Sequence, residues 1–266
     1  MKILLTGSKG NLGQALIRQG KNHRFVGIDR GDWDELARSM RGVQAVIHAA
    51  SDLVTPPRQD PRGVIDSNLM TSLHLLDQLV KRPTIRFVFI SSCAVYGQSA
   101  VTHEEVAPAP ISINGITKLL NEELIREFCQ DRGIEFQIFR VFNTFGGQDR
   151  FSIISHLRRS VEEKRPFKMF NGGVSQRDFV HVDDIAAVLL TLLDRPVKQA
   201  ILNIGSGETV RVSDVVEAFQ KKNPDLEIIR DTRQETEYSR ADISKLRKIL
   251  PKYEFRRVLD FVRDEL

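Results

Sequence analysis

The sequence predicts an α/β fold, a doubly wound parallel sheet followed by a small C-terminal lobe. Short apolar runs alternate with helical patterns through most of the 266 residues, which is typical of βαβ units whose strands lie parallel. A glycine-rich turn joins the first predicted strand to the first helix. From residue 151 onward, helices mix with irregular polar stretches, so we expect a separate lobe over 151–266.

The predicted elements follow one another in regular order. Six segments are predicted to be strands: Lys2–Leu5, Arg24–Ile28, Ala45–His48, Arg86–Ser91, Phe136–Val141 and Ala200–Asn203. Helices are clearest over Val64–Val80, Ile116–Gln130, where Gly133 is the stop, and Asp183–Leu193. Between the second and third predicted strands there is room for one helix, near Asp34–Met40, but not for a further strand. We therefore expect the sheet to end at the second strand. Right-handed crossovers place the ligand crevice at the carboxyl ends of the strands.

The first turn, in the run MKILLTGSKGNLG, has the pattern of a dinucleotide site. Gly7, Gly10 and Gly13 stand where the strand ends and the helix begins. Glycine permits the positive φ of a tight turn and lets the backbone approach a diphosphate, which the helix N-terminus then binds. Asp29, after the second strand, is placed to accept the adenosine ribose hydroxyls. A structural turn without a ligand is the alternative.

Composition excludes several classes of protein. Hydrophobic content of 41% and charged content of 28% are typical of a soluble globular chain, and no apolar run approaches the ~20 residues of a membrane helix. The net charge of +4 is spread among acidic residues, which disfavours a nucleic-acid partner. Cys93 and Cys129 lie far apart without metal-type spacing, so we expect no metal and a reducing, cytoplasmic setting.

Several further motifs give the chain a family likeness. In order they are TGSKGNLG at the start, IHAAS at 47–51, Asn68 before a helix, ISSCAVYG at 90–97, Lys118, RVFNTFGG at 140–147, QRDFVHVDDIA at 176–186 and LNIGSGE at 202–208. With this set the chain resembles the extended short-chain dehydrogenase/reductase family, in particular its nucleotide-sugar epimerases, dehydratases and reductases. The resemblance implies a Rossmann domain over 1–150 and a substrate lobe over 151–266, of which about 177–206 returns to the first domain.

The resemblance also implies a nicotinamide cofactor. The family's cofactor positions are occupied by Gly7, Gly10, Asn11, Leu12, Gly13, Asp29, Ala49, Ala50, Asn68 and Lys118. Asp29 favours NAD over NADP, since a carboxylate repels a 2′-phosphate. The adjoining Arg30 weakens that preference.

The family's chemistry uses a Ser or Thr, a Tyr and a Lys, and one of the three is replaced here. Ser92 takes the serine position and Lys118 the lysine position, but Asn114 stands in PISINGITK where the motif YxxxK has Tyr. An amide does not ionise, so Asn114 can hydrogen-bond a substrate oxygen but cannot act as an acid or base.

Three accounts of Asn114 remain open. The first is an active enzyme with a relocated proton carrier, for which the candidates are Tyr96, Cys93, His103 and His181. The second is a protein that binds NAD or a nucleotide sugar without turnover, such as a regulatory protein. The third is a substitution introduced on purpose. A family-type epimerase or reductase is the function we adopt. Cys93 and Ala94 stand where dehydratases carry an Asp-Glu pair, which disfavours a 4,6-dehydratase.

The second half of the chain supplies the substrate positions that the resemblance implies. Asn143 takes the position that contacts the sugar or diphosphate, and Arg177 and Arg233 take those of the phosphate-binding arginines. The helices at 64–80 and 116–130 correspond to those through which family members dimerise. Their apolar stripes permit a homodimer, although a monomer would use the same stripes to pack on the sheet.

Overall fold

A computed structural model describes residues 1–29, 31–52, 60–99, 102–195, 200–232 and 236–266. The chain divides into two compact units. The first comprises Met1–Gly97, Pro108–Arg140 and Ala186–Leu202, and the second comprises Gln98–Ala107, Val141–Ile185 and Asn203–Leu266. The domain boundaries expected from the sequence stay a prediction.

The central sheet confirms the predicted α/β fold. Its six strands lie in the order β10-β5-β4-β3-β1-β2. The strands are β1 (Lys2–Thr6), β2 (Arg24–Ile28), β3 (Ala45–His48), β4 (Arg86–Ser92), β5 (Phe136–Val141) and β10 (Ala200–Ile204). β1 pairs in parallel with both β2 and β3, and β3 pairs in parallel with β4. All six strands coincide with the predicted segments to within a residue, because strands covered on both faces are continuous apolar runs.

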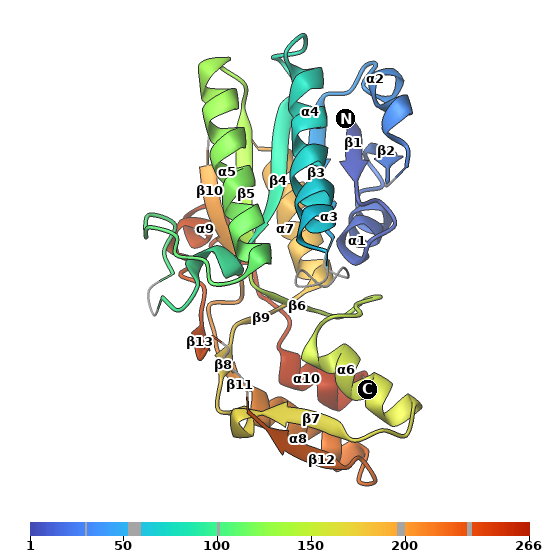
Figure 1. Ribbon diagram of the computed structural model, residues 1–266, viewed down its shortest axis with the longest axis vertical. Coiled ribbons are helices and arrows are strands. Elements are labelled where there is room, and N and C mark those ends of the chain that lie inside the picture. Colours follow the sequence, from blue (N-terminus) through green and yellow to red (C-terminus); the bar gives the residue numbers. More distant parts are fainter. Residues whose placement is uncertain (30, 53–59, 100–101, 196–199, 233–235) are drawn as a thin grey trace. The chain divides into compact units, whose positions relative to one another are not determined.

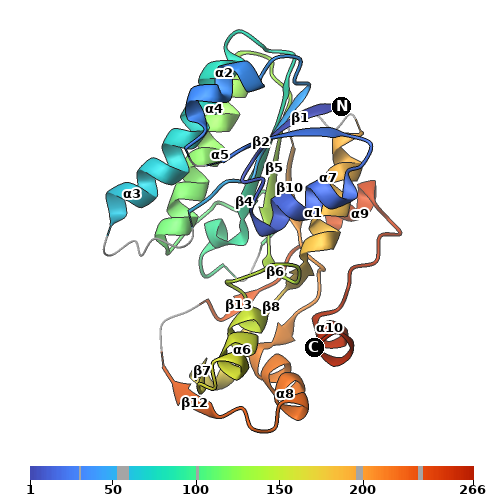
Figure 2. The same cartoon turned by 90° about the vertical axis from the view of Figure 1, so that its right-hand side faces the viewer.

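Helices cover both faces of the sheet (Figures 1 and 2). One face carries α3 (Pro61–Ile65), α4 (Thr71–Leu79) and α5 (Ile113–Asp131), and the other carries α1 (Asn11–Gln19) and α7 (Val182–Leu193). A π-helical stretch, Asp66–Met70, joins α3 to α4. The short segment after β2 forms η1 (Trp33–Glu35) and α2 (Leu36–Ser39), so β2 is an edge strand as predicted.

Helix α5 begins three residues earlier than the periodicity predicts. Ser112 caps it, since its hydroxyl oxygen accepts a hydrogen bond from the Gly115 N–H at 3.1 Å. The helix ends at Asp131, and Gly133 follows with a φ of +64° as the predicted stop. The early start places Asn114 in the first turn of α5.

The core of the first unit lies between the sheet and the helices α4 and α5. Buried side chains from β1, β3, β4 and β5 pack against apolar residues of both helices, among them Leu4, Val46, Phe87, Phe89, Ile138, Leu75, Leu79 and Ile125. Each such side chain contributes roughly 1.5–3 kcal/mol of burial free energy. This packing makes the strand ends a rigid support for the residues that follow them.

The second unit combines short strands with four helices. The strands are β6 (Asn143–Phe145), β7 (Phe167–Phe170), β8 (Gln176–Arg177), β9 (Phe179–His181), β11 (Val210–Arg211), β12 (Ile228–Asp231) and β13 (Tyr238–Ser239). The helices are α6 (Ile153–Glu162), α8 (Val212–Lys222), α9 (Ser244–Ile249) and α10 (Val258–Asp264), with a 3-10 turn, η4, at Asn171–Gly173. A second core joins α6, α8 and α10 through Leu157, Phe219 and Val262. Among the described helices, none is long and apolar enough to cross a membrane.

Candidate functional site

The glycine turn lies at the carboxyl end of β1, between the ends of β2 and β3. Gly7 has a φ of +71°, and a Cβ there would lie 2.9 Å from the Ala50 nitrogen. A Cβ on Gly13 would lie 2.2 Å from the Gly7 carbonyl oxygen. Any side chain at Gly13 would therefore displace the turn, so the sequence needs glycine at this position to let α1 approach it.

Asp29 is held beside this turn. Its carboxylate accepts hydrogen bonds from the Ser8 hydroxyl at 2.6 Å and from the Lys9 N–H at 3.4 Å. Helix α1 starts at Asn11 and Leu12, and Gly10 provides no side-chain cap for its first N–H groups. A turn with glycine at positions 7, 10 and 13, a helix start without a side-chain cap and a fixed carboxylate fit the diphosphate and ribose of a dinucleotide.

Asn68 fixes the loop after β3, where Ala49 and Ala50 stand. The Asn68 side chain is buried in the π-helical stretch, and its Oδ1 accepts a hydrogen bond from the Asp52 N–H at 2.6 Å. Its amide donates in turn to the Asp52 carbonyl oxygen at 3.3 Å. The Ala50 N–H donates to the Thr6 hydroxyl at 3.1 Å, which ties the same loop to β1. Asn68 thus acts on this region by holding the loop in place.

Lys118 lies under the carboxyl end of β4. The residue is 7% exposed. Its ammonium donates a hydrogen bond to the Ile90 carbonyl oxygen at 2.7 Å and lies 4.9 Å from the centre of the Phe89 ring. Burial lowers the pKa of Lys118 from 10.5 to about 8, although the nearby Glu122 carboxylate opposes the shift. Part of the Lys118 population is therefore a neutral amine at physiological pH.

The first turn of α5 packs against the turn that follows β4, η3 (Cys93–Tyr96). A Cβ on Gly115 would lie 2.4 Å from the Ala94 carbonyl oxygen, so glycine allows the close approach. The Ser92 hydroxyl oxygen accepts a hydrogen bond from the Ala94 N–H at 3.1 Å and so helps to form η3. The structure thus brings the Ser92 turn against the helix turn that carries Asn114.

Asn114 itself holds an unused acceptor. Its side-chain oxygen is buried, and among the described residues it accepts no hydrogen bond. A buried carbonyl without a donor costs roughly 1–3 kcal/mol. A ligand group with an O–H or N–H would satisfy it.

A buried ion pair beneath this site was not predicted from the sequence. Arg140 on β5 and Glu122 on α5 are 3% and 2% exposed and lie 2.7 Å apart between Nη2 and Oε2. The Ser91 hydroxyl donates to Glu122, and the Arg140 guanidinium lies 4.8 Å from the centre of the Tyr96 ring. One signal was available, because a charge inside the apolar strand FQIFRV requires a buried partner.

His48 is a second buried polar residue next to Lys118. Its Nδ1 lies 2.7 Å from the Thr6 hydroxyl and its Nε2 lies 2.9 Å from the Ser72 hydroxyl. Burial, followed by the Lys118 charge, lowers the pKa of His48 from 6.5 to about 3. His48 therefore stays neutral and ties β3 to β1 and α4.

Four residues were expected from the sequence as alternative proton carriers, namely Tyr96, Cys93, His103 and His181, and each has different surroundings. Tyr96 is 1% exposed and packs against Arg140. His181 belongs to the second unit, where it is buried against Phe145 and Phe261, and its Nδ1 accepts a hydrogen bond from the Asp183 N–H at 3.1 Å. His103 also belongs to the second unit. Of the four candidates, only Cys93 adjoins Ser92 at the surface-accessible start of η3.

Two of the residues expected to contact the substrate, Asn143 and Arg177, lie in the second unit. The Asn143 side chain donates to the Asp178 carbonyl oxygen at 2.8 Å, and Arg177, half-buried on β8, directly precedes Asp178. The Asp178 carboxylate, which the sequence analysis did not assign, accepts hydrogen bonds from the N–H groups of Ser206, Gly207 and Ala241. Asp178 therefore organises the chain around Asn143 and Arg177. Arg233 and Arg30 lie outside the described residues.

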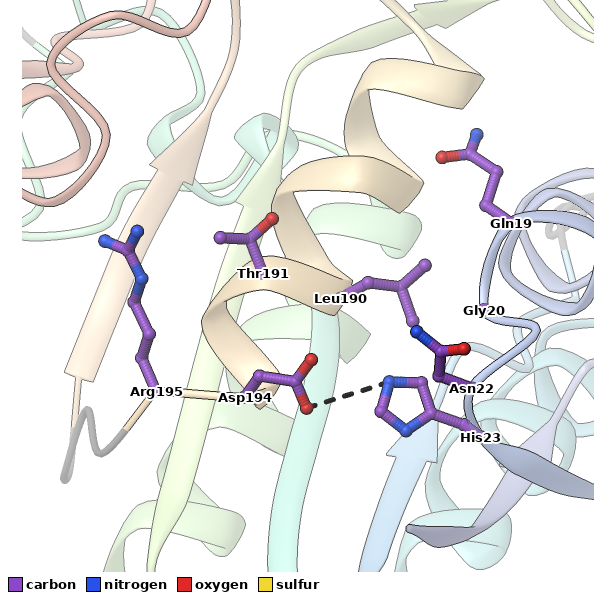
Figure 3. A pocket seen from close by; sticks show the side chains of 8 residues that line it. All are labelled: Gln19, Gly20, Asn22, His23, Leu190, Thr191, Asp194 and Arg195. Carbon is purple, nitrogen blue, oxygen red and sulfur yellow. Dashed lines mark ion pairs between the residues drawn. The ribbon is translucent and has the colours of Figure 1, made fainter.

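A cavity of about 450 Å³ opens at the opposite end of the first unit (Figure 3). It lies at the C-terminal ends of α1 and α7, next to the start of β2, whereas the glycine turn lies where the strands end. His23 and Asp194 face each other across it at 3.7 Å. The cavity is thus separate from the dinucleotide turn.

Comparisons with known proteins agree with this geometry. The model of the "NAD dependent epimerase/dehydratase family" matches residues 3–205. A UDP-glucuronate 4-epimerase from Thermodesulfobacterium geofontis is 28% identical over 88% of this chain and 75% of its own length. The solved structure of MoeE5 in complex with UDP-glucuronic acid and NAD is 25% identical with a TM-score of 0.88 and covers 100% of both chains. TunA, an NAD-dependent NDP-hexosamine 5,6-dehydratase, is 25% identical with a TM-score of 0.89 over 98% of this chain and 95% of its own.

Proposed function

The chain belongs to the NAD dependent epimerase/dehydratase family, and from that membership we propose that it is an NAD-dependent epimerase or reductase of a nucleotide sugar. The observation that carries the proposal is the set of residues at the strand ends of the first unit. The glycine turn, the Asp29 carboxylate and the buried Lys118 all stand at the carboxyl ends of strands in the parallel sheet. In an open parallel sheet this edge is where ligands bind.

NAD is the cofactor that these residues fit. The glycine turn and the start of α1 would hold the diphosphate, and Asp29 would hold the adenosine ribose. Lys118 donates one of its protons to the Ile90 carbonyl oxygen, and it would donate the others to the nicotinamide ribose. When bound, the nicotinamide ring supplies the hydride acceptor and donor. The Asp29 charge disfavours the 2′-phosphate of NADP.

A uridine diphosphate sugar, with glucuronic acid as the first sugar to test, is the substrate that we propose. The support comes from the names of relatives, since a UDP-glucuronate 4-epimerase and MoeE5 with UDP-glucuronic acid both match most of this chain. In the second unit, Arg177 would bind the diphosphate through its planar guanidinium, and Asn143 would contact the sugar or diphosphate. We keep Arg233 as a proposed second phosphate ligand.

Ser92 and Asn114 would orient the reacting oxygen of the sugar. The Ser92 hydroxyl has a proton to donate while its oxygen accepts from the Ala94 N–H. The buried Asn114 oxygen can accept a hydrogen bond from the substrate hydroxyl. Cys93 and Ala94 bring no carboxylate next to Ser92, so the proposal leaves out 4,6-dehydration.

We also propose a homodimer through α4 and α5. These helices lie side by side on one face of the sheet (Figures 1 and 2). Leu76 and Leu79 belong to the core, whereas Leu73, Leu120 and Leu124 are 37%, 46% and 37% exposed. Exposed leucines on neighbouring helices are suited to a self-complementary interface.

The test is turnover of the unmodified protein. It is incubated with NAD, and separately with NADP, against uridine, thymidine and guanosine diphosphate sugars. Sugar NMR must accompany mass spectrometry, because epimerisation leaves the mass unchanged. Conversion with NAD supports the proposal. No conversion of any sugar by protein that still binds NAD would contradict it and would favour a binding or regulatory protein.

A further inference from the structure

The face of α5 that looks toward the end of β4 carries three polar side chains at four-residue spacing, and these are Asn114, Lys118 and Glu122. Each has a different environment. Among the described residues, the Asn114 oxygen has no hydrogen-bond donor, Lys118 donates to the Ile90 carbonyl oxygen, and Glu122 is paired with Arg140. The chemistry of this face therefore depends on which of the three can exchange a proton.

The groups around Lys118 are excluded as proton carriers by their contacts or by their chemistry. Both Glu122 oxygens accept hydrogen bonds from the Arg140 guanidinium, and Oε1 also accepts one from the Ser91 hydroxyl. His48, which faces Lys118 from β3, has both ring nitrogens within hydrogen-bond distance of hydroxyl groups. Asn114 cannot ionise.

Lys118 is the group that can exchange a proton. One of its three protons is donated to the Ile90 carbonyl oxygen, and that hydrogen bond survives when the amine is neutral. A neutral amine keeps a lone pair, so it can accept a proton while it stays anchored. Burial disfavours the charged form, whereas the face of the Phe89 ring and Glu122 on the same helix favour it and limit the effect.

We propose that Lys118 is the proton carrier of the reaction, with Asn114 as the residue that positions the sugar hydroxyl. The inference rests on the proposed function. With NAD bound, the oxidative half would break the sugar O–H bond and form an N–H bond at Lys118 Nζ, and the cofactor would supply the acceptor for the hydride from the carbon that carries this oxygen. In the reductive half the reduced cofactor would supply the hydride to that carbon, and the Lys118 ammonium would give its proton back to the carbonyl oxygen. Lys118 ends each turnover as the neutral amine.

The first experiment measures Lys118 without any turnover. Protein carrying ¹³C at the lysine Cε positions is titrated by NMR, with and without NAD, and Lys118→Arg identifies the Lys118 signal by its loss. The signal is expected to titrate near pH 8 in the cofactor-free protein. A signal that remains that of an ammonium up to pH 10 would overturn the inference.

The second experiment compares variants. Lys118→Arg keeps a charge and hydrogen-bond donors but cannot release a proton, so the rate should fall by about 10²–10⁴-fold. The affinity for NAD should stay within several-fold, which shows that the site still forms. Adding Asn114→Tyr to Lys118→Arg supplies a phenol beside a fixed positive charge and should restore part of the rate. Cys93→Ala should keep the pH dependence of the parent protein.

The outcomes distinguish a failure of the proton-carrier role of Lys118 from a failure of the proposed function. If the unmodified protein converts a sugar and Lys118→Arg keeps its rate and pH profile, the proton-carrier role is wrong and the proposed function stands. If Cys93→Ala removes the pH dependence, Cys93 is the carrier instead. If the unmodified protein converts no sugar, the proposed function fails and takes this inference with it, whatever the NMR titration gives.

Discussion

Arg140 and Glu122 form a buried ion pair that joins β5 to α5, with Arg140 Nε 3.1 Å from Glu122 Oε1 and Nη2 2.7 Å from Oε2. Breaking such a pair from one side leaves a buried charge alone, which costs about 3–5 kcal/mol. We expect Arg140→Met and Glu122→Gln each to lower the free energy of unfolding by about that amount. The double variant Glu122→Leu/Arg140→Met should regain most of the loss. Urea unfolding measures this, and additive losses in the double variant would contradict it.

His48 makes the stability depend on pH. The unfolded chain binds this proton below about pH 6.5, whereas the folded chain does not bind it until about pH 3. The free energy of unfolding should therefore fall as the pH falls from 6.5 toward 3, by up to roughly 3–5 kcal/mol at about 1.4 kcal/mol per pH unit. His48→Gln should show a smaller pH dependence in urea unfolding. The control is His74→Gln, on the exposed side of α4, and an equal reduction in both variants would speak against His48.

Gly13 is needed to form the glycine turn, which we propose binds the dinucleotide. Gly13→Ala places a Cβ 2.2 Å from the Gly7 carbonyl oxygen, so the turn must shift and the affinity for NAD should fall at least about tenfold, or 1.4 kcal/mol. Gly42→Ala is the control, because Gly42 has a φ of +69° but open space around its Cβ position. It should cost about 1–2 kcal/mol of stability and leave NAD binding intact. Calorimetric titration of both variants decides whether binding or stability is affected.

We expect Asp29 to set the choice between NAD and NADP. Asp29→Asn removes the charge but keeps the shape that accepts the Ser8 hydroxyl. The ratio of the two dissociation constants should shift toward NADP by about tenfold or more, since the repulsion of the 2′-phosphate is lost. Asp34→Asn, exposed in η1, is the matched control. An unchanged ratio in Asp29→Asn would place cofactor discrimination elsewhere.

The leucines of α5 should hold the proposed dimer together. Leu120→Glu and Leu124→Glu introduce charges at side chains that are 46% and 37% exposed. In a dimer these charges would be buried, so light scattering after size exclusion should show a monomer. Ile17→Glu, 40% exposed on α1, is the control and should keep the parent mass. A parent protein that is already monomeric at micromolar concentration would refute the interface.

The sequence pattern was sufficient to predict the strands of the central sheet, because burial on both faces makes each strand a continuous apolar run. β3, for example, is AVIH, and all four residues are buried. The second unit offered no such signal. Gln176–Arg177 pairs with Val210–Arg211 and with Tyr238–Ser239, and strands of two residues carry no periodicity. Their pairing depends on distant contacts, among them those of the Asp178 carboxylate.

The sequence alone could predict which candidate site residues lie together where those residues share one helix. Asn114 and Lys118 are one turn apart, so the α5 helix alone places them together. The Glu122–Arg140 pair and the His48 contacts were missed, because they join residues from separate elements. The capping role of Ser112, which moves the start of α5 to Ile113, was also missed.

The most direct test of the central claim is a proton NMR time course of UDP-glucuronic acid with the unmodified protein and catalytic NAD. The account predicts that signals of the C4 epimer grow to a constant ratio with the starting sugar, with Asn114 at the position where the sequence analysis expects the family's tyrosine. The same spectra from Asn114→Tyr give the comparison rate. An unchanged spectrum for the unmodified protein, alongside conversion by Asn114→Tyr, would contradict the account and identify a decayed enzyme.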